Sequence, residues 1–179
     1  NIFPVQGNLL SLPLRDSFFD LVLLNGVLEW VGTFSSAHSA TELQEMALRE
    51  TARVLRPNGV LYVAIENRFG LQYFMGYREE HTALRFISLL PRGMANRYHK
   101  HRRGKDFRAL TYSRRALTRM LRKGGFSSTK WFSVFPSYRN CRYAASLEGT
   151  GALAFLFKNV LSHRFSLPGK ILRIGLRAV

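Results

Sequence analysis

The chain has 179 residues, 46% of them hydrophobic and 13% aromatic, and its 27 Lys and Arg against 11 Asp and Glu give a formal charge of +16. This hydrophobic content excludes an intrinsically disordered chain, and the single cysteine, Cys141, excludes an internal disulfide and a cysteine-based zinc site. No apolar run reaches the roughly 18 to 20 residues of a transmembrane helix. We therefore expect a soluble, cytoplasmic protein that is at most peripheral to a membrane.

The first predicted elements form a strand–helix–strand unit. Residues 1–6 are predicted to form a short strand, and the apolar run at 20–24 a second strand that is covered on both faces. A helix is predicted to open with Thr41 as its cap and to end before the turn at 57–59, and a further buried strand follows at 59–65. Such a unit predicts a parallel α/β sheet with a right-handed crossover.

The pattern then loosens, and residues 66–110 are predicted to be a basic insertion on the substrate side of the domain. Regular structure resumes with a helix that a Ser or Thr at 111–113 caps and that Gly124 and Gly125 end. A strand is predicted at 130–134. We assign residues 1–148 to the domain and residues 149–179 to an amphipathic, basic tail or linker.

The positive charge is concentrated in the second half of the chain. Residues 92–123 contain 12 Lys and Arg and one acidic residue, whereas residues 1–60 contain 4 and 6. The basic block indicates an anionic partner, either a phosphate-bearing small molecule or an anionic membrane surface, and a merely solvated face is the alternative. Nucleic acid is the less favoured partner because stacking aromatics do not alternate with the charges. His99 and His101 fall on different helix faces, so no metal site is predicted.

Four stretches of the chain carry a family pattern: GNLLSLPLRDSFFDLVLLNGVLEWV (7–31), LRETARVLRPNGVLYVAIENRFG (48–70), TYSRRALTRMLRKGGF (111–126) and WFSVFPSYRN (131–140). In this order they resemble class I S-adenosylmethionine-dependent methyltransferases of the type 11-like group. The resemblance implies an α/β, Rossmann-like sheet and S-adenosylmethionine as cofactor. The family's glycine-rich turn, and the acidic residue that ends its second strand, have no counterpart here. Because these elements are missing and the sequence opens with NIFPV rather than Met, we expect the C-terminal part of a methyltransferase domain, a fragment that binds the cofactor weakly alone.

The resemblance also implies site residues. Two of them are predicted to be catalytic, because a base is needed where a hydroxyl or amine acceptor must lose a proton: Glu66, with His81 as the alternative base. Simpler roles remain open: Glu66 pairs with Arg68 or caps the following loop, His81 is an ordinary loop residue, Gly7 only makes a turn, and Trp30 is core. The predicted cofactor-binding residues are Gly7, Asn8, Leu9, Asn25, Gly26 and Val27, and the predicted substrate-binding residues are Glu29, Trp30, Asn67, Arg68 and Tyr112.

The sequence IENRFGLQYFMGYREEHT, followed later by FPSYRN, resembles a subgroup of these enzymes that is found in proteins that build or modify cell-surface glycans. It implies methyl transfer to a hydroxyl or phosphate of a glycan or glycolipid precursor. Two other classes remain open: a noncatalytic methyltransferase-like scaffold, and a basic module that binds or modifies nucleic acid. The sequence does not determine the oligomeric state.

Overall fold

The computed structural model describes residues 1–33, 35, 38–108, 110–149, 151, 154 and 158, and the chain divides into two compact units, 1–127 and 128–179. In chain order the elements are β1 (Phe19–Asn25), the 3-10 helix η1 (Leu28–Trp30), α1 (Ala40–Val54), β2 (Leu55–Ala64), α2 (Leu71–Phe74), the 3-10 helix η2 (Ile87–Leu89), α3 (Arg92–Arg103), α4 (Arg114–Lys123), β3 (Phe132–Ser137) and β4 (Asn140–Ser146).

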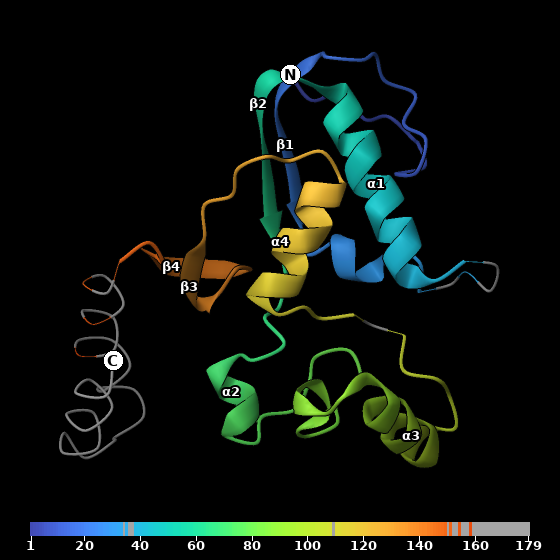
Figure 1. Cartoon of the computed structure of the whole chain (residues 1–179), viewed down its shortest axis with the longest axis vertical. Coiled ribbons are helices and arrows are strands. Elements are labelled where there is room, and N and C mark those ends of the chain that lie inside the picture. The colour runs from blue at the N-terminus through green and yellow to red at the C-terminus, as the bar shows by residue number, and fades with distance from the viewer. Residues whose placement is uncertain are drawn as a thin grey trace. The chain divides into compact units, whose positions relative to one another are not determined.

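A parallel pair of strands organises the first unit (Figure 1). β1 pairs with β2 so that Leu24 lies opposite Val63 and Asn25 opposite Ala64. Parallel strands need a crossover connection, and α1 supplies it and packs against β2 and α4. The mixed α/β class predicted from the sequence is confirmed, as are the strand at 20–24 and the helix that follows it.

The ends of α1 differ from the prediction. Its cap is Ser39 rather than Thr41, because Ser39 and Glu42 form a reciprocal capping box. The Glu42 backbone N–H donates to Ser39 Oγ at 3.3 Å, and the Ser39 N–H donates to Glu42 Oε2 at 3.0 Å. The helix ends at Val54, and β2 begins at the next residue, four residues earlier than predicted.

The strand pair has one covered and one open face in the described part of the chain. Leu24 is 5% exposed, whereas its neighbour Leu23 is 61% exposed. Leu23 lies opposite Tyr62, which is exposed, as are Leu21 and Val60 in the next register position. Side chains alternate between the faces of a strand, so a strand expected to be buried on both faces is buried here on one.

The strand predicted at 1–6 is wrong: residues 1–7 form no regular structure, and Phe3 is 81% exposed. A strand is held by its ladder of hydrogen bonds to a neighbour, and no described strand pairs with this stretch. The loop that follows is anchored on α1 by Arg53, which donates to the carbonyl oxygens of Leu14 and Leu12 at 2.9 and 3.0 Å. The Leu12 N–H donates to Glu50 Oε1 at 2.7 Å.

The segment predicted as an insertion contains a helix that the sequence pattern did not reveal, α3. Only Ala95 of α3 is buried, so its sequence carries no apolar stripe that would predict a helix. Ala95 joins a small core with Leu84, Ile87 and Phe107. The helix ends at Gly104, whose φ of 69° is the left-handed conformation that favours glycine.

The predicted helix after residues 111–113 is confirmed as α4, with Ser113 Oγ accepting from the Ala116 N–H at 3.3 Å. The second unit holds an antiparallel hairpin of β3 and β4. β3 overlaps the strand predicted at 130–134, whereas β4 was not predicted. Most of the predicted tail lies outside the described residues, and among the described residues no helix is long and apolar enough to span a membrane.

Truncation of the two neighbouring leucines of β1 tests the assignment of the two faces. Leu24→Ala removes a buried side chain and is expected to lower the free energy of unfolding by about 2 to 5 kcal/mol. Leu23→Ala, on the open face, is expected to lower it by less than about 1 kcal/mol. Urea denaturation followed by circular dichroism measures both. Equal losses would contradict an open face.

Candidate functional site

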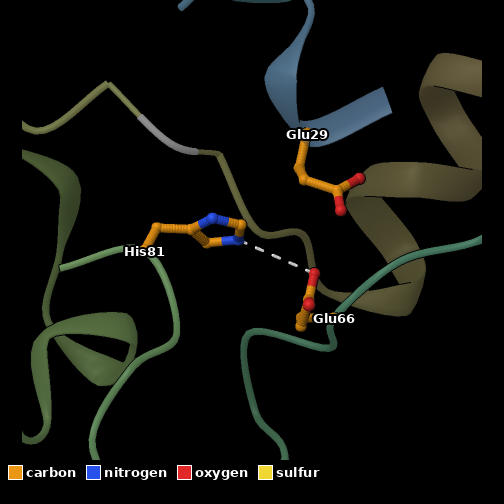
Figure 2. Close-up of side chains that lie close together, drawn as sticks. All are labelled: Glu29, Glu66 and His81. Atoms are coloured by element: carbon orange, nitrogen blue, oxygen red, sulfur yellow. Dashed lines mark ion pairs between the residues drawn. The ribbon is translucent and has the colours of Figure 1, made fainter. Parts of the chain in front are cut away.

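Three side chains that are far apart in the sequence converge in the first unit (Figure 2). Glu29 lies on η1, just after β1; Glu66 follows β2 by two residues; and His81 lies in the loop after α2. One potential ligand atom from each lies within 4.8 Å of the others. The carboxyl ends of parallel strands meet at one edge of a sheet, and ligands bind beyond that edge in open α/β folds. The sheet therefore supplies two carboxylates, and the inserted segment supplies the imidazole.

The cluster is buried. His81 Nε2 lies 3.7 Å from Glu66 Oε2 and 3.8 Å from Glu79 Oε1, and the His81 and Glu66 side chains are 4% and 7% exposed. The Trp30 ring packs edge to face on the His81 ring, with 4.6 Å between the ring centroids. The structure thus brings together Glu29, Trp30, Glu66 and His81 of the predicted residues.

Burial and mutual repulsion set the protonation of the cluster. Burial raises the pKa of the Glu29 carboxyl above its ordinary value, and the negative charge of Glu66 adds to this. The interaction with Glu66 is the main cause that raises the pKa of His81, and with the charges of Glu79, Glu66 and Glu29 it outweighs the opposing effect of burial. The two shifts favour the protonated forms, which are a neutral Glu29 carboxyl and a positively charged His81 ring.

Glu79 holds the loop that carries His81, and the sequence analysis missed it. Its Oε2 accepts hydrogen bonds from the His81 N–H at 3.1 Å, the Thr82 N–H at 2.7 Å and Thr82 Oγ1 at 2.7 Å. Glu79 is 1% exposed, and buried carboxylates are rare unless they are paired. Its place beside Glu80 in the sequence gave no sign that one of the two is buried.

Gln44 holds η1 in place and was also missed. This fully buried residue of α1 donates from Nε2 to the Leu28 carbonyl at 2.8 Å and accepts from the Tyr112 hydroxyl. A glutamine on the apolar side of an amphipathic helix, next to Leu43 and four residues before Leu48, was the available signal.

The remaining predicted substrate-binding residues lie together but bond mainly to the backbone. Asn67 and Tyr112 form an isolated parallel bridge, and the Arg68 N–H donates to the Tyr112 carbonyl at 3.1 Å. Arg68 Nε donates to the Ser88 carbonyl at 2.8 Å, and its Nη2 donates to the Leu90 carbonyl. These hydrogen bonds fix the inserted segment to the sheet edge. The substrate roles of the three residues stay predictions.

A cavity of about 610 Å³ opens beside the cluster. Its lining combines the buried side chain of His81 and the partly exposed Trp30 with exposed basic residues of the inserted segment. The lining residues are Trp30, Thr33, His81, Thr82, His99, Lys100, Gly104, Lys105, Asp106, Phe107 and Arg108.

Residues 2–63 match the sequence model of a family described as a methyltransferase domain. A solved S-adenosylmethionine-dependent methyltransferase from Thermotoga maritima superposes with a TM-score of 0.51 at 22% identity, over 84% of this chain and 60% of the matched chain. Residues 2–63 are part of a methyltransferase domain. The similarity to the solved structure shows a shared fold, and this chain spans 60% of the length of that enzyme. No curated protein sequence matches the chain.

The cofactor that such a methyltransferase domain implies is S-adenosylmethionine, and the edge of the sheet fits it on one side. Asn25 and Val27 are exposed at the carboxyl end of β1, and between them Gly26, with a φ of 67°, turns the chain without a side chain. The Gly26 N–H donates to the Ala64 carbonyl at 2.8 Å, which joins the ends of both strands.

The other predicted cofactor residues, Gly7, Asn8 and Leu9, lie in the loop before β1 of this methyltransferase domain. A Cβ on Gly7 would lie 2.7 Å from Pro13 Cδ, so the turn itself requires glycine. Asn8 Oδ1 accepts from the Leu10 N–H at 3.0 Å, and the side chain is exposed. A cofactor role for these three residues stays a prediction.

Removal of Gln44 tests its role in placing Glu29. Gln44→Ala leaves the Leu28 carbonyl and the Tyr112 hydroxyl without this buried partner and is expected to lower the free energy of unfolding by about 1 to 3 kcal/mol. The adjacent Glu45→Gln, which weakens ion pairs with the exposed Arg49 and Lys123, is expected to cost less than about 1 kcal/mol. Denaturant titrations compare the two variants, and equal costs would contradict the role.

Proposed function

We propose that this protein is an S-adenosylmethionine-dependent methyltransferase that acts on a hydroxyl of a phosphate-bearing glycan or glycolipid precursor. The observation that carries the proposal is the cavity beside the cluster. Its lining contains the buried side chain of His81 and the exposed Lys100, Lys105 and Arg108. A ligand that carries a neutral hydroxyl at one end and an anionic group at the other matches this polarity.

Bound S-adenosylmethionine supplies an electrophilic methyl carbon, so the chain's own residues need only orient the acceptor and accept its proton. We assign Asn25, Gly26 and Val27 to the cofactor side of the sheet edge. We assign Glu66 and His81 to the acceptor side, where Glu66 Oε2 and His81 Nε2, 3.7 Å apart, share the proton that leaves the hydroxyl. The Trp30 ring lines the cavity and packs edge to face on the His81 ring.

A hydroxyl fits the buried side of the cavity better than a phosphate acceptor does. Glu29, Glu66 and Glu79 would repel an anion that had to approach His81. A phosphate on the outer side instead meets Lys105, and Trp30 offers an aromatic surface for an apolar sugar face. A glycolipid acceptor brings the enzyme to the cytoplasmic face of a membrane, and the free, exposed Cys141 suits that reducing compartment.

Loss of the charge on Glu66 is the direct test of this function. In the full-length protein, Glu66→Gln is expected to lower kcat by about 10² to 10⁴ while the fold is retained, because the variant no longer accepts the acceptor proton. Mass spectrometry measures the gain of one methyl group on sugar phosphates incubated with S-adenosylmethionine. Glu45→Gln makes the same change on α1, outside the cavity lining, and as the control it is expected to keep the wild-type kcat. If the wild-type protein binds the cofactor but methylates no sugar phosphate, the acceptor assignment fails, and if it does not bind the cofactor, a scaffold role is favoured.

Lys105 tests the outer side of the cavity. Lys105→Ala is expected to raise KM for a phosphorylated acceptor about tenfold with little change in kcat, which corresponds to one lost charge-assisted hydrogen bond. KM for the same sugar without its phosphate is expected to stay unchanged. Lys130→Ala, an exposed lysine of the second unit, is the matched control. An equal effect on both sugars would contradict phosphate recognition at Lys105.

A further inference from the structure

We propose that Glu29, Glu66 and His81 form a binding site for a divalent transition-metal cation. Binding of the cation does not depend on methyl transfer. Only its effect on an acceptor hydroxyl rests on the function proposed above. The sequence gives no sign of this site, because its residues are 37 and 15 positions apart and come from three separate loops.

The geometry is close to that of a metal site. Two atoms bound to one zinc or manganese ion at about 2.1 Å lie roughly 3.4 Å apart in tetrahedral geometry and at most about 4.2 Å apart. His81 Nε2 and Glu66 Oε2 are 3.7 Å apart, and the ligand atoms of all three residues lie within 4.8 Å. A shift of the Glu29 or Glu66 carboxylate oxygen by less than about 1 Å would bring all three ligand atoms within bonding distance of one ion.

His81 independently points to a ligand at this place. Its side chain is only 4% exposed, and Nε2 is directed toward Glu66, as Figure 2 shows. Among the described residues Nε2 has no hydrogen-bond partner, and carboxylate oxygens of Glu66 and Glu79 lie 3.7 and 3.8 Å away. A buried polar atom without a partner is costly. A cation between Nε2 and Glu66 would satisfy it.

The charge of the cluster calls for a cation. The buried Glu66 and Glu79 each have a carboxylate oxygen within 4 Å of His81 Nε2, so two carboxylates lie beside one imidazole. Buried carboxylates are stable when they are paired or when they coordinate a metal.

The donor set selects the class of metal. An imidazole nitrogen favours zinc, iron and related ions, while carboxylate oxygens also suit manganese. Calcium and magnesium prefer sites built from oxygen alone. Glu79 Oε1, 3.8 Å from His81 Nε2, adds a further negative charge, and the three hydrogen bonds to Glu79 Oε2 hold that carboxylate beside the site. We therefore expect Mn²⁺ and Zn²⁺ to bind more tightly than Mg²⁺.

A cation at this position would act on an acceptor in the adjoining cavity. A hydroxyl oxygen bound to a divalent metal loses its proton more readily, as a metal-bound water does. With the cation bound, Glu66 and His81 serve as its ligands, and the proton of the hydroxyl passes to water while the oxygen stays on the metal.

Calorimetric titration of the tag-free, metal-stripped full chain with MnCl₂ or ZnCl₂ tests the inference. One cation per chain is expected to bind, with affinity at least about tenfold lower in Glu66→Gln and in His81→Ala. Glu45→Gln and His101→Ala replace the same residue types outside the cluster and are expected to bind as the wild type does. Absence of binding, or equal binding in Glu66→Gln and the wild type, overturns the proposal.

If His81→Ala does not fold, the effect of the cation on the thermal unfolding of Glu66→Gln still tests the proposal. Glu66→Gln keeps the shape of the side chain and removes a buried charge, so we expect it to fold and to lose the rise in Tm that the cation gives the wild type. Methyl transfer measured in parallel separates the two proposals. Cation binding without transfer overturns the proposed function alone, whereas transfer by protein that binds no cation overturns the metal site alone.

Discussion

The parallel register of β1 and β2 places Asn25 opposite Ala64, and the whole site depends on this pairing. Two strands that run in the same direction end at the same edge, so the residues that follow them are neighbours whatever their distance along the chain. Glu29 and Glu66 meet for this reason. A hairpin of the same two strands would have put them at opposite ends of the sheet.

The acidic cluster and the basic surface of the inserted segment have opposite electrostatic character, and the cavity lies between them. Three buried carboxylates lie close to His81, which lines the cavity, in a chain whose formal charge is +16. Exposed Lys100 and Lys105 stand on its outer side. The two regions therefore favour different groups of a bound ligand. A cation, a proton or a neutral hydroxyl is favoured near the acidic cluster, and an anionic group is favoured near Lys100 and Lys105.

Residues around the cluster hold in place the segments that carry its side chains. Gln44 fixes the 3-10 helix that carries Glu29, and Glu79 fixes the loop that carries His81, each through hydrogen bonds to buried groups. Arg68 attaches the inserted segment to the sheet edge through two carbonyl oxygens. Catalytic and metal-binding groups need such partners because a side chain that is free to rotate does not hold a productive geometry.

The sequence by itself determined the α/β class, the strand at 20–24, the helices that became α1 and α4, and Glu66 and His81 as candidates. Each of these follows from local information: apolar runs, helical periodicity, caps and motifs. Only the tertiary structure decided that residues 1–7 form no strand, that α3 is a helix, and that Gln44 and Glu79 are buried, because these depend on neighbours distant in sequence. The convergence of Glu29 with Glu66 and His81 was likewise a tertiary result, since no spacing rule spans two strand ends and an inserted loop.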